Sequence, residues 1–132
     1  MSDVPVRLEL APRFEVLLCG AVFLIRLRGV PDADDIRRAM ELVQGHPASQ
    51  SRYAIVWVLT EAIRGFDRSL LTVHRHAGRD VLPVFMGIVA WHRMQRAVIR
   101  TMSAGLEVAI GVGLSVFADE PSALDAARRA LS

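Results

Sequence analysis

The chain has 132 residues, a hydrophobic content of 52% and a formal net charge of +2 at pH 7. This length suits one well-packed domain and is short for two, so we expect a single domain over residues 1–132. The longest stretches without a charged residue, such as Val108–Ala118, run about 11 residues, whereas a membrane-spanning helix needs roughly 20. We therefore expect no membrane insertion.

The N-terminus and the cysteine content indicate the compartment. Residues Met1–Leu10 carry Asp3, Arg7 and Glu9 and have no long apolar core, so they do not resemble a signal peptide. Cys19 is the single cysteine, which rules out an intramolecular disulfide and fits a reducing environment. We expect a cytoplasmic protein in which Cys19 is a small buried residue of a strand.

The N-terminal segment predicts two or three antiparallel strands. Val6–Leu10 alternates apolar and charged residues, which is typical of a half-exposed strand. Phe14–Leu18 is a short apolar run. Ala21–Arg28 alternates again, with Arg26 and Arg28 on the face opposite its apolar residues.

A helix is predicted after the loop Gly29–Asp32. Asp32 can serve as the N-cap, and the acidic residues of the next turn interact favourably with the helix dipole. Apolar residues then recur at helical spacing until Gly45–Pro47 ends the helix. His46 lies in this loop, so we expect it to be solvated.

Tyr53–Thr60 predicts a central strand. The segment is β-branched and aromatic and has no charge, which is typical of a strand buried on both faces, with Trp57 in the core. Glu61–Asp67 forms the loop at the carboxyl end of this strand, and Arg68–Asp80 is a second amphipathic helix.

Two histidines of this helix, His74 and His76, raise the question of a metal site. A spacing of two residues places them about 200° apart around the helix, whereas ligand pairs on helices stand three or four residues apart. We therefore expect no metal and no other cofactor.

The stretch Val81–Phe117 predicts a strand, a helix and a second strand, the pattern of a βαβ crossover. Its parts are the apolar run Leu82–Ala90, the amphipathic segment Trp91–Gly105 and the strand Leu114–Phe117. Leu106–Ile110 could extend the helix or follow it. Acidic residues and a proline then start a terminal helix, whose packed residues include Leu124.

Taken together, the elements predict an α/β fold with the order β-β-β-α-β-α-β-α-β-α. Short antiparallel strands followed by repeated helix–strand alternation imply a mixed sheet covered by about four helices. In open α/β sheets, functional sites lie at the carboxyl ends of strands. Trp91 and His92 occupy such a position, beside the loop Glu61–Asp67.

The chain resembles the STAS-like superfamily, which includes anti-sigma factor antagonists and SpoIIAA-like domains. The resemblance covers nearly the whole chain. It rests on the opening strand pair, Phe23–Gly29 with the acidic helix start after it, Tyr53–Thr60, and Leu114–Glu120 leading into the alanine-rich Ala123–Leu131. This last element is particularly similar to stand-alone bacterial members. The resemblance implies a STAS-like fold and a non-enzymatic regulatory or scaffolding module in signalling.

Phosphorylated members of the superfamily have an Asp-Ser-Ser-Gly-like turn after the central strand. The matching residues here are Asp67, which fits, Arg68 in place of the phosphorylated serine, and Leu70 in place of the glycine. Ser69 is the neighbouring candidate for phosphorylation, because a phosphate is favoured at a helix N-terminus. The ordinary interpretation of Ser69 is a first-turn helix serine.

Protein–protein interaction is the first functional hypothesis, since no nucleophile, base and acid stand together in the sequence. The expected surface comprises Glu61, Arg64, Asp67, Arg68, Ser69, Trp91, His92, Arg93 and Arg96.

A small-ligand-binding protein or an enzyme is the alternative. His92 would then act as an acid or base, Arg93 or Arg96 would hold an anion, and Trp91 would stack on a ring. The more ordinary interpretation places Trp91 in the core and His92 at a helix cap.

Self-association is a third hypothesis, because the strands of Val6–Leu18 could pair with a second copy across an exposed edge to form a homodimer. Nucleic-acid binding is less favoured, because the basic residues, all of them arginine, are spread along the chain.

Overall fold

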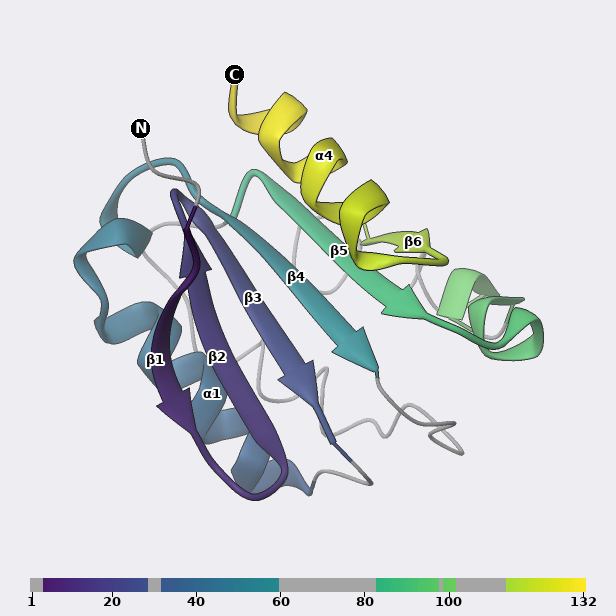
Figure 1. Cartoon of the computed structure of the whole chain (residues 1–132), viewed down its shortest axis with the longest axis horizontal. Helices are drawn as coiled ribbons and strands as arrows, with labels where there is room; N and C mark the ends of the chain where they lie inside the picture. The colour runs from purple at the N-terminus through teal and green to yellow at the C-terminus, as the bar shows by residue number, and fades with distance from the viewer. Residues whose placement is uncertain (1–3, 29–31, 60–82, 98, 102–113) are drawn as a thin grey trace.

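One six-stranded mixed sheet organises the chain (Figure 1). The computed structural model describes residues 4–28, 32–59, 83–97, 99–101 and 114–132. The strands are β1 Val6–Leu10, β2 Phe14–Cys19, β3 Val22–Leu27, β4 Ala54–Leu59, β5 Phe85–Ala90 and β6 Leu114–Phe117. They lie in the sheet in their sequence order. β1, β2 and β3 pair antiparallel, and β3 to β6 pair parallel.

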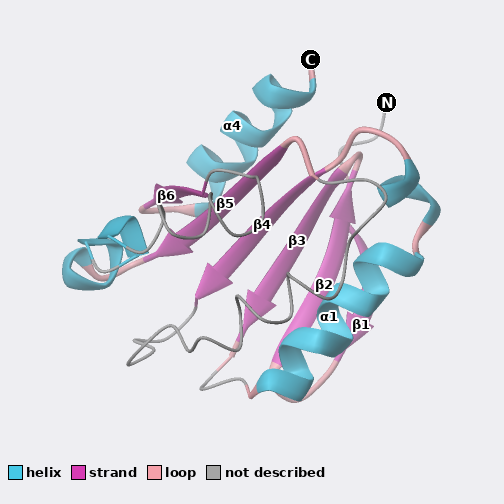
Figure 2. Ribbon diagram, turned by 180° about the vertical axis from the view of Figure 1, so that it is seen from behind, coloured by secondary structure: helices cyan, strands magenta, loops and turns pink. Residues whose placement is uncertain are grey.

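Helices cover both faces of this sheet. The elements are α1 Ala33–Gly45, the 3-10 helix η1 Pro47–Gln50, helical residues at 93–97 and 99–101, and α4 Glu120–Leu131. α1 lies behind the sheet in Figure 1 and in front of it in Figure 2, whereas α4 lies on the opposite face. Two separate cores result, one on the α1 side and one on the α4 side.

The predicted α/β fold with antiparallel N-terminal strands is confirmed, and all six predicted strands are present. β5 and β6 are parallel neighbours, as the predicted crossover requires. Three of the predicted helices appear in the described residues; the fourth, Arg68–Asp80, lies outside them, as does Leu106–Ile110.

β4 is buried on both faces, as expected for a central strand. Ile55, Trp57 and Leu59 enter the α1-side core, and the alternate residues of β4 enter the α4-side core. Trp57 is 1% exposed, which confirms its predicted place in the core. Cys19 is also buried, as expected.

The β2–β3 hairpin has a tight turn that fixes its register. Cys19 pairs with Val22, so Gly20 and Ala21 form a two-residue turn. Gly20 has a φ of +63°, a conformation that glycine adopts without the steric cost of a Cβ. The register then sets Glu15 opposite Arg26.

A capping box starts α1, as Asp32 predicted. The Asp32 side chain accepts a hydrogen bond from the Asp35 N–H, and the Asp35 side chain accepts one from the Asp32 N–H. Arg13, in the turn between β1 and β2, lies 3.4 Å from the Asp32 carboxylate. The hydrogen bond from the Asp35 N–H is the largest cause that holds the pKa of Asp32 below its ordinary value, and the Arg13 charge lowers it further.

Two glycines provide a test of the packing. A Cβ on Gly87 would lie 3.0 Å from Phe85 and 3.2 Å from Phe117, whose rings pack together on β5 and β6. Gly87→Ala should therefore lower the free energy of unfolding by about 1–2 kcal/mol through overpacking. Gly45→Ala is the matched control, because a Cβ there meets nothing within 4 Å.

Gly45 ends α1, so the control should gain about 0.5–1 kcal/mol from the higher helix propensity of alanine. Urea denaturation of both variants measures these changes. Equal effects of the two substitutions would show that Phe85 and Phe117 do not constrain position 87.

Candidate functional site

The predicted site residues fall into two groups. Glu61, Arg64, Asp67, Arg68 and Ser69 lie outside the described residues, as do His74 and His76. Trp91, His92, Arg93 and Arg96 lie at the carboxyl end of β5, where the chain enters the helical residues 93–97 and 99–101. The ordinary interpretation of Trp91 as a core residue is wrong, because 51% of it is exposed.

Trp91 has an apolar neighbour in the sequence that is also exposed. Met94, in the helical turn that starts at residue 93, is 82% exposed, and Arg93 is exposed as well. His92 precedes this helix, and its backbone C=O accepts a hydrogen bond from the Arg96 N–H at 3.0 Å, as expected of a helix-capping position. We call Trp91, Arg93 and Met94 the Trp91–Met94 surface.

Arg96 ties this helix to the end of β5. Its Nη1 donates to the backbone C=O of Ala90 at 2.8 Å and to that of Trp91 at 3.1 Å. These carbonyls belong to the last residue of β5 and to the residue after it. Arg96 therefore positions the Trp91–Met94 surface, and this guanidinium nitrogen is engaged by the protein itself.

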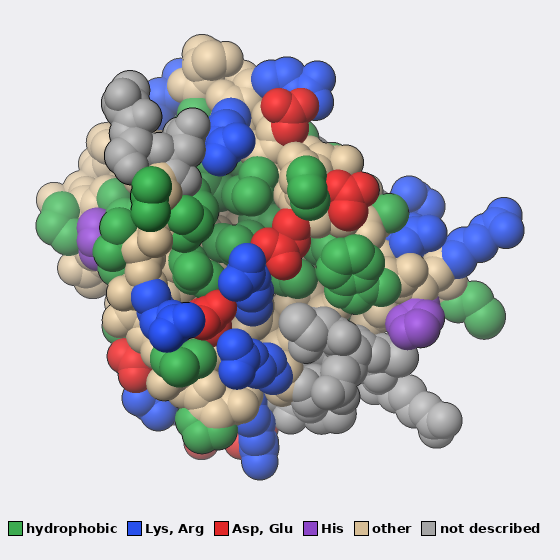
Figure 3. Space-filling view, viewed as in Figure 1, with side chains coloured by type: hydrophobic (Ala, Val, Ile, Leu, Met, Phe, Trp, Pro, Cys, Tyr) green, Lys and Arg blue, Asp and Glu red, His purple; other side chains and the backbone are tan. Residues whose placement is uncertain are grey.

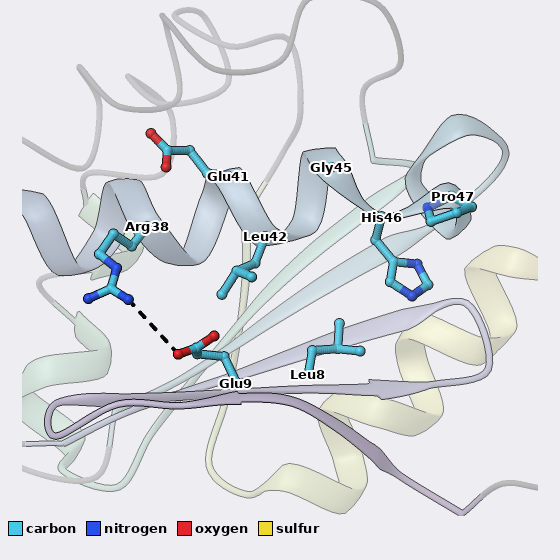
Figure 4. A pocket seen from close by; sticks show the side chains of 8 residues that line it. All are labelled: Leu8, Glu9, Arg38, Glu41, Leu42, Gly45, His46 and Pro47. Carbon is cyan, nitrogen blue, oxygen red and sulfur yellow. Dashed lines mark ion pairs between the residues drawn. The ribbon is translucent and has the colours of Figure 1, made fainter.

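A groove with a volume of about 470 Å³ separates β1 from α1. Leu8 of β1 and Leu42 of α1 point into it from opposite sides (Figure 4). Arg38 and Glu9 form an ion pair of 3.9 Å at one end. His46 lies at the other end, with its ring toward Leu8.

His46 is half-buried, so the expectation that it is solvated is wrong. Its ring packs edge-on against Phe23, with 5.7 Å between ring centroids. Its Nδ1 accepts a hydrogen bond from the Ala48 N–H at 3.1 Å and so caps η1. This bond requires an unprotonated Nδ1, which leaves the proton of the neutral ring on Nε2.

A buried carboxylate lies on the α4 side of the sheet. Glu15 is 2% exposed, and three guanidinium groups surround it. Its Oε2 lies 3.1 Å from Arg7 Nε and 3.8 Å from Arg28 Nη2. Its Oε1 accepts a hydrogen bond from Arg26 Nη1 at 3.1 Å. We call Arg7, Glu15, Arg26 and Arg28 the Glu15 cluster.

The Glu15 cluster extends to α4. Arg26 Nη2 donates to Glu120 Oε1 at 3.0 Å, so one guanidinium joins β2, β3 and the first turn of α4. The bonds to Glu120 and then to Glu15 raise the pKa of Arg26 above its ordinary value. Figure 3 shows basic and acidic side chains side by side over this part of the sheet.

The sequence pattern does not single out Glu15, because it stands within the apolar run Phe14–Leu18. A signal for it nevertheless exists. Gly20 and Ala21 predict a two-residue turn, and counting back from that turn places Glu15 opposite Arg26. The burial of Glu15 depends on the arginines of β1 and of the segment after β3, which no local pattern reveals.

Two general features concern the described residues alone. No helix in this part of the chain has the length and apolar character needed to cross a bilayer. No three His, Cys, Asp or Glu side chains of these residues are grouped so that they could hold a metal ion.

Glu15 should contribute strongly to stability. Glu15→Gln keeps the shape of the side chain but removes the charge that the arginines face. The arginines left behind are partly solvated, so we expect the free energy of unfolding to fall by about 2 kcal/mol. Asp125→Asn is the control: it breaks the Asp125–Arg129 pair, which is exposed on α4, and should change stability by less than about 0.5 kcal/mol. Chemical denaturation measures both, and a loss below about 1 kcal/mol for Glu15→Gln would contradict a stabilising cluster.

Asp119 should make stability depend on pH. It caps α4, and hydrogen bonds from Ser122 hold its pKa below the ordinary 3.8. A lowered pKa in the folded state means that Asp119 stabilises the protein above about pH 4 and loses this effect as the pH falls through its lower folded value. In Asp119→Asn the melting temperature should therefore fall less between about pH 5 and pH 2 than in the wild type. If the melting temperatures of the variant and the wild type fall by the same amount over that pH range, Asp119 does not contribute this pH dependence.

Comparison with known proteins bears on the fold. No model of a known protein family matches the chain, and no curated protein matches it. The fold is similar to a solved structure described as an enoyl-CoA hydratase/carnithine racemase from Magnetospirillum magneticum. The TM-score is 0.50 at 11% sequence identity, over 92% of this chain and 75% of that chain. At this identity the likeness concerns the mixed α/β fold alone.

Proposed function

We propose that this chain is a non-enzymatic regulatory or scaffolding module of the STAS-like kind, which acts by binding a protein partner. The observation that carries the proposal is the Trp91–Met94 surface. Trp91 is half exposed and follows directly on the buried strand β5, and Met94 is largely exposed and lies in the helical turn that comes next. Tryptophan, methionine and arginine are among the side chains enriched in protein interfaces.

The setting of this surface suits recognition. Arg96 anchors the start of the helix to the last carbonyls of β5, so Trp91 and Met94 are held on a supported backbone. A backbone that is already anchored loses little conformational entropy on binding. Arg93 and Arg100 are exposed in the same segment, which favours a partner with acidic groups.

The order of elements supports the STAS-like assignment. The stretch Leu114–Glu120, on which the resemblance rests, forms β6 and the start of α4. The remaining interaction residues come after the strand next to β5. β4 ends at Leu59, which pairs with Ala90, the residue before Trp91. The other proposed interaction residues, Glu61, Arg64, Asp67, Arg68 and Ser69, follow Leu59 in the sequence, and Ser69 remains the proposed phosphorylation site.

Affinity capture tests the proposal. The tagged wild-type protein should retain a specific partner, identified by mass spectrometry. The double variant Trp91→Ala/Met94→Ala should retain at least tenfold less, because truncation of an interface tryptophan typically costs 2 kcal/mol or more, roughly a thirtyfold loss in affinity. The control is Val84→Ala, which truncates an exposed apolar side chain before the start of β5.

Other outcomes decide against this function. Recovery of no other protein would count against the proposal, and co-purification of an untagged second copy would favour the homodimer. Equal capture by the double variant and by the Val84→Ala control would remove the Trp91–Met94 surface from the proposal. A small-ligand-binding protein or an enzyme would be favoured if no partner is captured and a small molecule stabilises the wild type. Loss of that stabilisation in Gly45→Phe would place the ligand in the groove between β1 and α1, which Gly45 lines, and loss in Trp91→Ala would place it at Trp91. A ligand at a hundred times its Kd adds about 2.7 kcal/mol of stability.

A further inference from the structure

The Glu15 cluster carries more positive than negative charge at the protein surface. Arg7, Arg26 and Arg28 are part-exposed to exposed, whereas Glu15 is buried beneath them. Glu120 is the second carboxylate of the cluster and bonds Arg26 alone among the described residues. Three guanidinium groups therefore face two carboxylates, which leaves one positive charge in excess.

Glu15 fixes the positions of these arginines. Arg7 Nε and Arg28 Nη2 converge on the same oxygen, Oε2, from β1 and from the residue after β3. Each contact uses one nitrogen of its guanidinium, and a guanidinium carries five N–H donors in a rigid fork. The remaining donors of Arg7 and Arg28 are thus held next to each other, with more than half of each side chain exposed.

The surroundings of the cluster leave it accessible from the α4 side. α4 packs mainly against β4 and β5, and β1 to β3 extend beyond it in Figure 1. Leu10, which pairs with Glu15 in the β1–β2 register, is 51% exposed. An exposed apolar side chain beside oriented guanidinium groups suits an acidic polypeptide segment better than an isolated ion.

We propose that the Glu15 cluster, with Leu10, is a second protein-binding surface that takes an acidic segment of the partner through the forks of Arg7 and Arg28. The inference rests on the proposed function, because it names the chemistry of a protein partner. The guanidinium groups are ordered before binding, so bidentate contacts to aspartate or glutamate form at a reduced entropic cost.

A labelled acidic peptide tests whether this surface binds an acidic segment. We would use a fluorescein-labelled peptide in which glutamate alternates with valine and threonine, and the same peptide with glutamine in place of glutamate. Fluorescence anisotropy with the whole protein should show at least tenfold tighter binding of the acidic peptide. Its affinity should fall with rising salt, as expected of charge pairing.

Variants then locate the binding. Arg7→Gln/Arg28→Gln should weaken binding of the acidic peptide at least tenfold. The control Arg37→Gln/Arg129→Gln removes the same charge from exposed pairs on α1 and α4 and should change the affinity less than twofold. Arg7→Lys/Arg28→Lys keeps the charge but lacks the fork, so it should also bind several times more weakly. Circular dichroism checks that each variant is folded. If Arg7→Gln/Arg28→Gln does not fold, Arg7→Lys/Arg28→Lys alone decides the test.

Three results would overturn the inference. Equal loss in the two glutamine pairs would show that net charge alone attracts the peptide. Wild-type affinity in the lysine pair would show that the forks are not used. Displacement of the peptide by inorganic phosphate at equal concentration would identify a site for small anions instead of a polypeptide.

The test is separate from that of the proposed function. If affinity capture retains a partner equally well on the wild type and on Arg7→Gln/Arg28→Gln, the inference fails and the proposed function stands. If no partner is captured but the peptide binds as described, the cluster recognises acidic segments and the proposed function loses its support.

Discussion

The fold depends on the burial of β4. All six of its residues are buried, and it pairs parallel to β3 on one side and to β5 on the other. Parallel strands cannot be joined by tight turns, and a strand covered on both faces needs a layer on each side. The chain meets both requirements with α1, which connects β3 to β4 on one face, and α4, which packs on the other.

This central burial restricts where polar and reactive groups can lie. Charged side chains are absent from β4 and β5, so those that the described residues hold near the sheet lie toward its margins. On the α4 side, the arginines of the Glu15 cluster cover the part of β1 to β3 that lies beyond the helix. Their aliphatic stems cover sheet surface while their charged ends stay solvated, an arrangement that long cationic side chains favour.

Much of the fold could be predicted from the sequence, because the strands are short and their hydrophobic patterns are distinct. β6 has the predicted bounds, and β1 follows directly from the alternation of Val6–Leu10. β5 is shorter than the predicted Leu82–Ala90, because an apolar run does not show where ladder pairing starts. Hydrophobic periodicity reflects the local geometry of the backbone, so it predicts the elements whose structure is decided locally.

The candidate site was less predictable, because its features depend on contacts between distant segments. His46 follows a glycine and precedes a proline, which indicates a solvated loop, but its ring packs on Phe23 of β3. Trp91 follows an apolar strand, which indicates burial, but the chain turns outward there and Arg96 anchors the turn. Of these features, only the pairing of Glu15 with Arg26 follows from a local signal, the turn at Gly20.

The distance between the two proposed surfaces bears on whether the protein is a switch or a scaffold. Arg7 lies on β1 and Arg28 follows β3, so three strands separate the first from β5 and one strand separates the second. Because neighbouring strands lie about 4.8 Å apart, the two surfaces stand on parts of the sheet roughly 10 to 19 Å apart. Partners that bind at β1 and at the end of β5 need not exclude one another. A single partner that binds both surfaces would have to span that distance, which takes about three to six extended residues. A protein that holds two partners together on one sheet acts as a scaffold. A switch would need mutually exclusive binding, which would require the two surfaces to overlap.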